Sequence, residues 1–346
     1  MNAGPVKLRM HCFDLPLRHA FGISRFTHAV QPSLVIELND GAHRGYGEAT
    51  TDPYYGVSMP HMISVVETVR DLVQSTHWDH PAVLWETLGD HLAHESFVRC
   101  AIDQAAHDLW GKRQGKPTYE MLGIEMNECP ISSFTIGLDR QEVMVQKLLE
   151  EPDWPIYKIK LGTDHDLQLV EALRNHTEAV FRVDANCAWT SQQTIENAVL
   201  LKDLGVELIE QPLPADDWVG ARRVYQESVL PVIADESCLI ASDVDRCVDH
   251  FHGVNIKMVK CGGITPALKM IRQARTLGMR VMLGCMTESS VGISGIAQLL
   301  PLLDYVDIDG ANLLAADIAS GVKVERGVCL YPETPGNGIS EFQVGG

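Results

Sequence analysis

The chain has 346 residues, 45% hydrophobic and 21% charged, with a formal net charge of −18 at pH 7. This length and composition are typical of a soluble globular protein with one barrel and a smaller domain. The strong negative charge argues against nucleic acid or an anionic membrane as a partner. Because no stretch approaches about 20 apolar residues and no signal peptide or C-x-x-C pair is present, we expect a cytoplasmic protein without a membrane span.

The first 128 residues predict an α+β domain. Residues 6–17 and 33–49 alternate or carry β-branched side chains between turn formers, as antiparallel strands do. Residues 59–74 and 96–115 have apolar positions at helical spacing, and the second helix should stop at Gly115. Strands followed by helices without alternation indicate an α+β capping domain over 1–128.

From residue 129 the pattern changes to strict alternation of strands and amphipathic helices. Eight candidate strands are present, at 131–138, 157–162, 180–186, 206–212, 231–237, 253–260, 280–286 and 304–310. Seven helical segments separate them, so the sequence predicts an α/β fold, a (β/α)7β modified TIM barrel over 129–320. We expect the loop-rich segment 321–346 to pack back and complete the capping domain.

Five charged residues recur at intervals of 22 to 26 residues, each at the end of an apolar run: Lys160, Asp184, Glu210, Asp235 and Lys257. That interval suits one strand, one helix and two short loops. Side chains alternate faces along a strand, and these residues all share the face opposite their aliphatic neighbours. Since the carboxyl ends of barrel strands converge on one site, we expect these five side chains to meet there.

The three acids follow consecutive strands and predict a metal site. Carboxylate oxygens suit Mg²⁺, with Mn²⁺ as the second choice. The pattern adds no histidine or cysteine ligand to Asp184, Glu210 and Asp235, which argues against zinc. The alternative for any single acid is a cap on the following helix.

Lys160 and Lys257 belong to the second and sixth predicted strands, which lie on opposite walls of an eight-stranded barrel. A carbon held between two amines can lose a proton to one and gain a proton from the other on the opposite face. The base must be neutral, and both a divalent cation and the neighbouring Lys158 would lower its pKa. The alternative for a lone strand lysine is a surface residue, and Lys260 is expected to be solvated or to lie behind the site.

These residues resemble the enolase superfamily, and within it the muconate-lactonizing-enzyme subgroup. The motifs that carry the resemblance are KIK (158–160), DAN (184–186), EQP (210–212), ADES (234–237) and NIKMVKCGG (255–263). The resemblance covers essentially the whole chain. It implies that Asp184, Glu210 and Asp235 bind Mg²⁺, that the ion binds a substrate carboxylate, and that lysines remove and return the α-proton.

The sequence DIDG at 307–310 is similar to the D-x-D signature of dipeptide epimerases that resemble alanyl-glutamate epimerase. In those enzymes the paired aspartates hold the α-ammonium group of the dipeptide. Two inward carboxylates, Asp307 and Asp309, would supply the countercharge for such a cation. Thr135 and the sequence GCM at 284–286 also fit this subgroup.

One loop departs from the acidic-dipeptide members, which place an arginine against the distal carboxylate. Here His28 aligns with that arginine, and Arg25 is near it. A neutral or apolar second side chain is therefore expected. The apolar lining would come from Phe21, Ile23, Phe26, Tyr54 and Tyr55.

The resemblance thus implies a Mg²⁺-dependent dipeptide epimerase that inverts the α-carbon of the C-terminal residue of an L-Ala-Xaa dipeptide. We expect the protein to form a homo-oligomer. The first alternative is another enzyme on the same scaffold: an N-acylamino acid racemase, an o-succinylbenzoate synthase or a muconate cycloisomerase. Substrates of those enzymes carry no free ammonium group, so Asp307 and Asp309 argue against them. The second alternative, a binding protein on a decayed barrel, is disfavoured because both lysines and all three acids are present.

Overall fold

The computed structural model describes residues 6–344. The amino-terminal part begins with an antiparallel sheet in the order β1-β2-β3. Its strands are β1 (Lys7–Gly22), β2 (Thr27–Asn39) and β3 (Arg44–Thr50). Four helices follow: α1 (Met59–Ser75), α2 (Pro81–Thr87), α3 (Ser96–Gln114) and α4 (Thr118–Met121). Strands followed by helices confirm the predicted α+β character.

Local sequence signals explain where these elements begin and end. Pro60 lies in the first turn of α1, where its missing N–H is not needed. Helix α3 ends at Gly115, which adopts φ 64°, a left-handed conformation that glycine accepts without steric cost. The predicted strand 33–49 is divided between β2 and β3, because Asp40 and Gly41 turn the chain.

The second part of residues 6–344 is an eight-stranded parallel sheet in sequential order from β4 to β11. Its strands are β4 (Phe134–Ile136), β5 (Ile156–Lys160), β6 (Val180–Asp184), β7 (Val206–Glu210), β8 (Val232–Ala234), β9 (Gly253–Ile256), β10 (Arg280–Gly284) and β11 (Tyr305–Asp307). A parallel bridge between Ser132 and Val306 joins the two edges and closes the barrel.

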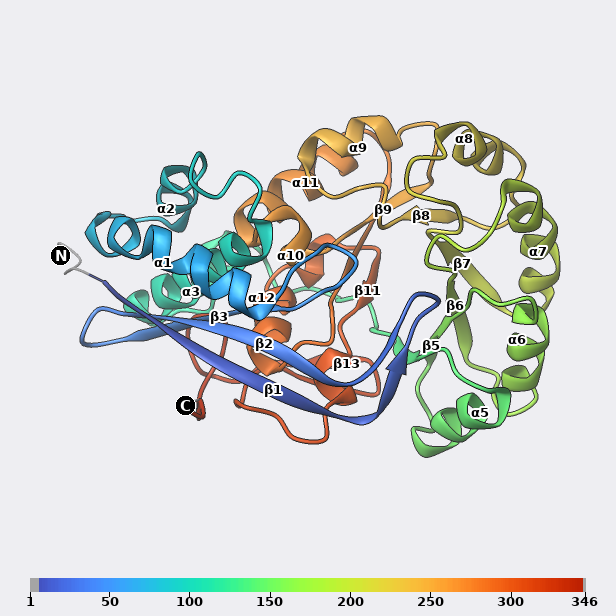
Figure 1. Ribbon diagram of the computed structural model, residues 1–346, viewed down its shortest axis with the longest axis horizontal. Coiled ribbons are helices and arrows are strands. Elements are labelled where there is room, and N and C mark those ends of the chain that lie inside the picture. The colour runs from blue at the N-terminus through green and yellow to red at the C-terminus, as the bar shows by residue number, and fades with distance from the viewer. Residues whose placement is uncertain (1–5, 345–346) are drawn as a thin grey trace.

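Helices connect consecutive barrel strands, and most of them form the outer ring on the right and at the top of Figure 1. They are α5 (Gln141–Glu150), α6 (Asp166–Arg174), α7 (Ser191–Asp203), α8 (Trp218–Glu227), α9 (Ala241–Cys247), α10 (Met258–Cys261), α11 (Ile264–Thr276) and α12 (Ser290–Ala297). Since α10 and α11 share one crossover, seven helical connections join the eight strands. The predicted (β/α)7β modified TIM barrel is confirmed.

All eight barrel strands end before the predicted residue, and three of them end three or four residues early, at the end that carries the charged residues. Strand β9 stops at Ile256, and residues 258–261 form α10; β8 stops at Ala234; β11 stops at Asp307. Side chains satisfy the backbone groups that the strands leave free. Gln211 accepts a hydrogen bond from the Asp235 N–H, and Lys260 donates to the carbonyls of Asp235 and Asn255. The charged residues therefore lie at the ends of the strands or directly after them.

The carboxyl-terminal segment packs against the first domain, as Figure 1 shows at the left. It includes β12 (Lys323–Glu325) and β13 (Val328–Leu330), whereas η1 (Leu300–Leu302) and η2 (Gly310–Leu313) flank β11. Asn337 accepts a hydrogen bond from Thr118 and donates its backbone N–H to Asp108. The division at 128/129 and the assignment of 321–346 to the capping domain stay predictions, and residues 1–5 and 345–346 lie outside the described part.

All nine cysteines are free; Cys238 and Cys261 are buried, whereas Cys187 and Cys285 are only half-buried. Within residues 6–344, no helix has the length and apolar character needed to cross a membrane.

Candidate active site

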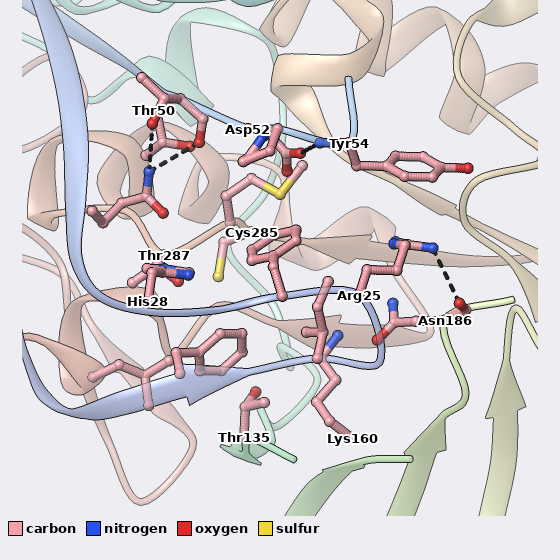
Figure 2. Close-up of a pocket in the computed structure, with 18 of the residues that line it drawn as sticks. Arg25, His28, Thr50, Asp52, Tyr54, Thr135, Lys160, Asn186, Cys285 and Thr287 are labelled. Carbon is pink, nitrogen blue, oxygen red and sulfur yellow. Dashed lines mark hydrogen bonds between the residues drawn. The ribbon is translucent and has the colours of Figure 1, made fainter. Parts of the chain in front are cut away.

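The carboxyl end of the barrel and the capping domain enclose a cavity of about 390 Å³, a size typical of small-molecule sites. Figure 2 shows Lys160 and Thr135 on the barrel side and Arg25, His28 and Tyr54 on the capping side. The predicted site residues that line this cavity are Phe21, Ile23, Arg25, Phe26, His28, Tyr54, Tyr55, Thr135, Lys158, Lys160, Asp235, Lys257, Asp307 and Asp309. Asp184 and Glu210 lie beneath its floor with no exposed surface.

The three acids form a compact cluster at the barrel floor. Oxygen atoms of Asp184, Glu210 and Asp235 lie within 4.8 Å of one another, and all three residues are buried. Burial raises the pKa of Glu210, and the negative charge of Asp184 raises it further. Three converging carboxylates supply an all-oxygen donor set, which fits a hard divalent cation such as Mg²⁺. The residues present therefore fit the metal that the sequence predicts.

Each lysine of the site contacts one or more of these carboxylates. Lys160 Nζ donates to Asp184 over 2.6 Å, and Lys257 Nζ donates to Asp235 over 2.7 Å. Burial lowers the pKa of Lys257, but the carboxylate of Asp235 raises it more strongly, so the net change is upward. Both amines are thus tied to the acid cluster while their side chains line the cavity.

Lys158 has a different position from the other two amines. Its Nζ lies 2.7 Å from both Asp307 and Glu210 and 3.4 Å from Asp184, and its side chain is 2% exposed. Burial lowers its pKa, but these three carboxylates hold the pKa well above the usual range. Lys158 is therefore a fixed cation that joins the acid cluster to the aspartate pair.

Lys160 and Lys257 approach the cavity from different sides of the barrel. Lys160 is the last residue of β5, whereas Lys257 directly follows β9. In the sheet order, β6, β7 and β8 separate these two strands. This is the opposite-wall arrangement that the repeat spacing predicted.

The two aspartates of the DIDG sequence converge on Thr135. The Thr135 hydroxyl lies 3.3 Å from Asp307 Oδ1 and 3.1 Å from Asp309 Oδ1, and its backbone N–H donates to Asp309 over 2.6 Å. Burial raises the pKa of Asp309, and the charge of Asp307 adds to this effect. The expectation that both occupy one strand is wrong, because β11 ends at Asp307 and Asp309 precedes η2. The turn nevertheless brings Asp309 beside Asp307.

The capping side is aromatic, and its charges are already engaged. The β1–β2 hairpin tip contributes Phe21, Ile23, Arg25 and His28. The His28 ring lies 6.0 Å from that of Phe21, and burial lowers its pKa, so it is neutral at pH 7. Arg25 donates to the carboxylate of Glu236 over 2.6 Å.

Sequence reasoning missed several residues that complete the site. Glu236 pairs with Arg25, and Asp52 accepts the backbone N–H of Tyr54 at the cavity rim. Asn255 donates to Glu210 Oε1 over 2.8 Å. Of the two positions expected for Lys260, the structure shows the one behind the site: the residue is 3% exposed and donates to Asp235. Asn255 and Glu236 stand inside the quoted motifs, so their motif membership was the available signal.

Comparison with known proteins places this geometry in a family. Residues 142–341 match the family model described as enolase C-terminal domain-like. Residues 7–123 match the amino-terminal domain model of mandelate racemase/muconate lactonizing enzyme. Together the two models account for most of the chain.

Individual relatives agree over nearly the whole length. The chain is 50% identical over 335 residues to an L-Ala-D/L-amino acid epimerase of Flavobacterium johnsoniae, covering 97% of this chain and 99% of the relative. It is 36% identical to an L-Ala-D/L-Glu epimerase of Bacteroides thetaiotaomicron, covering 98% and 89%.

Among solved structures, a dipeptide epimerase from Enterococcus faecalis, complexed with Mg and L-Leu-L-Tyr, superimposes with a TM-score of 0.90 at 29% identity, covering 98% of this chain and 100% of that one. The chain therefore belongs to the enolase superfamily, in its mandelate racemase/muconate lactonizing enzyme branch, and it is an isomerase.

Proposed function

We propose that this protein is a Mg²⁺-dependent dipeptide epimerase that inverts the α-carbon of the C-terminal residue of an L-Ala-Xaa dipeptide with a neutral or apolar Xaa. The observation that carries the proposal is one cavity with Lys160 and Lys257 on opposite sides and the aspartate pair 307/309 between barrel and cap. The epimerase names of the Flavobacterium and Bacteroides relatives support the same class of substrate.

The reaction needs one neutral amine and one ammonium group on opposite faces of the α-carbon. Lys160 removes the proton of one epimer, and Lys257 returns a proton to the other face; the opposite epimer uses the pair in reverse. A divalent cation held by the three carboxylates would stabilise the charge that builds on the substrate carboxylate and would lower the pKa of nearby lysines. Lys158 keeps its proton throughout, because three carboxylates surround it.

The aspartate pair favours a substrate with a free α-ammonium group. Asp307 and Asp309 share the Thr135 hydroxyl, so one cation can reach both carboxylates by charge-assisted hydrogen bonds. An N-acylated amino acid offers no positive charge there, so the pair would lack a countercharge from the substrate. This feature favours a dipeptide epimerase over an acylamino acid racemase.

The neutral capping side supports a neutral or apolar Xaa. Because the pKa of His28 is lowered and Phe21 and Ile23 line the same wall, the side chain of Xaa meets apolar surface. A homo-oligomeric assembly and a cytoplasmic location stay predictions.

A dipeptide library in deuterated water, with Mg²⁺ present, tests the proposal. We expect a gain of one mass unit at the α-carbon of the C-terminal residue, together with the appearance of its D-epimer, for L-Ala-L-Leu and similar dipeptides. The same assay with N-acetyl-L-Leu is the matched control. Exchange of N-acetyl-L-Leu without exchange of any dipeptide would refute the proposal and indicate an acylamino acid racemase.

A further inference from the structure

One wall of the active-site cavity also borders a second, outer groove of about 740 Å³. The residues that line both spaces are Arg25, Tyr54, Asn186 and Glu236. Figure 2 shows Arg25 extended towards Asn186 with Tyr54 beside it. These four residues therefore form a partition between the cavity and the outside, and we call them the Arg25 wall.

Both terminal nitrogens and one face of the Arg25 guanidinium group have partners inside this wall. Nη2 donates to Glu236 Oε1 over 2.6 Å, and Nη1 donates to the Asn186 carbonyl over 3.1 Å. Its carbon atom lies 3.9 Å from the centre of the Tyr54 ring. Since both terminal nitrogens and one face are engaged, the fork needed to bind an external carboxylate by two hydrogen bonds is already used.

Glu236 is a built-in countercharge for this arginine and not a solvated acid. Its side chain is 2% exposed, whereas that of Arg25 is 27% exposed. Oε2 of Glu236 is buried without a hydrogen-bond partner. Burying a carboxylate oxygen without a hydrogen-bond partner costs free energy. The carboxylate is nevertheless held beside the cavity, where it fixes the position of Arg25 and balances its charge.

We propose that Glu236 is a specificity-determining residue that neutralises Arg25 and thereby excludes dipeptides with an acidic Xaa; the inference rests on the proposed function. A substrate carboxylate near this wall would meet a neutral pair, and the carboxylate of Asp52 lines the same cavity. An apolar side chain avoids that repulsion and contacts Phe21 and Phe26 instead.

The test compares kcat/KM for L-Ala-L-Glu with kcat/KM for L-Ala-L-Leu in Glu236→Gln. The glutamine oxygen still accepts a hydrogen bond from Arg25, but the negative charge is gone. We expect the Glu/Leu ratio to rise about tenfold or more, mainly through a lower KM for L-Ala-L-Glu. The double variant Arg25→Gln/Glu236→Gln should lose this gain, because the gain depends on the freed guanidinium group.

Glu207→Gln is the matched control, because Glu207 pairs with Arg182 outside the cavity and its loss changes the net charge equally. It should leave the ratio within threefold of wild type. An unchanged ratio in Glu236→Gln, with L-Ala-L-Leu still turned over, would overturn the inference.

Arg25→Gln alone decides the question even if Glu236→Gln does not fold. We expect a Glu/Leu ratio within threefold of wild type, since Arg25 does not serve the substrate. A selective loss of L-Ala-L-Glu turnover by tenfold would show a free arginine and overturn the inference. Failure of the proposed function has a separate signature, because the wild-type protein would then turn over neither dipeptide.

Discussion

The barrel side and the capping side of the cavity are built in different ways. On the barrel side the charged residues end strands or directly follow them, and nearly all are buried and joined by short hydrogen bonds, as Lys160–Asp184 and Lys257–Asp235 are. On the capping side the residues come from a hairpin tip and a turn, and Tyr54 remains 42% exposed. The strand register fixes the first set, while the second set can change without disturbing the barrel. Chemistry should therefore depend on the barrel side, and choice of substrate on the capping side.

The largest effect should follow loss of the metal site at the barrel floor. We expect exhaustive chelation to lower turnover by about 10⁴-fold, since the charge stabilisation that a cation supplies is worth several kcal/mol. Added Mg²⁺ should restore activity. Asp235→Asn should show a comparable loss that Mg²⁺ does not restore.

Glu227→Gln, on the outer face of α8, is a control that removes an acid without touching the cluster. Steady-state kinetics with L-Ala-L-Leu measures all three cases. Full activity after chelation would contradict the metal assignment. It would also contradict the expectation that the chemistry depends on the barrel side.

The second effect separates the two lysines by stereochemistry. Lys160→Ala should stop α-proton exchange from one epimer, and Lys257→Ala should stop exchange from the other, each by about 10²–10⁴-fold. Deuterium uptake from the pure L,L and L,D dipeptides measures each half-reaction. A single variant that still epimerises at a near-normal rate would exclude the two-base model.

The third effect concerns the ammonium group at the aspartate pair. N-acetylation of L-Ala-L-Leu removes the cation and leaves Asp307 and Asp309 buried without it. Truncating one member of a buried charge pair costs about 2–5 kcal/mol, so kcat/KM should fall by about 30-fold or more. Equal turnover of the free and acetylated dipeptides would mean that the pair does not hold the substrate.

The same contrast explains how much of the site could be predicted from sequence. A period of two along each strand and a repeat of 22 to 26 residues define where Lys160, Asp184 and Glu210 must lie. Both rules are local, so the positions of the barrel-side residues could be predicted without a structure. The rules end with the strand: Lys260 was expected to be solvated or to lie behind the site, and only the structure decides for the second position, because the chain turns into α10 directly after β9.

The capping side follows no such rule. The pairing of Arg25 with Glu236 joins residues 211 positions apart, and no periodicity relates a hairpin tip to the end of β8. The sequence could identify the capping-side residues as lining the cavity, but it could not identify the partners of their side chains. The neutral state of His28 likewise depends on burial that only the packed fold provides.

A smaller effect should follow changes on the capping side itself. Phe21→Ala should raise KM for L-Ala-L-Leu and leave kcat nearly unchanged, because lost apolar contact weakens substrate and transition state alike. A loss of about 1–3 kcal/mol of binding free energy corresponds to a fall of about five- to 150-fold in kcat/KM. Steady-state kinetics measures the fold-change in KM and the fold-change in kcat, and the two are compared. A fall mainly in kcat would show that the capping side also contributes to the chemistry carried out on the barrel side.

The smallest effect on turnover should come from the joint between the two regions, where Glu48 of β3 accepts hydrogen bonds from Ser289 and the Gly292 N–H at the start of α12. Beside it, burial raises the pKa of Glu288 to about 8, and the charge of Glu48 contributes. The usual value is 4.5, so between pH 4.5 and 8 the folded state keeps a proton that the unfolded state releases. The free energy of unfolding should therefore fall as pH rises through this window, by at most about 1.4 kcal/mol per pH unit.

Glu288→Gln is neutral at every pH and should remove that fall while leaving kcat/KM unchanged. Urea unfolding of both proteins at pH 5, 6, 7 and 8 measures it, and parallel profiles would show that Glu288 is ionised in the folded protein.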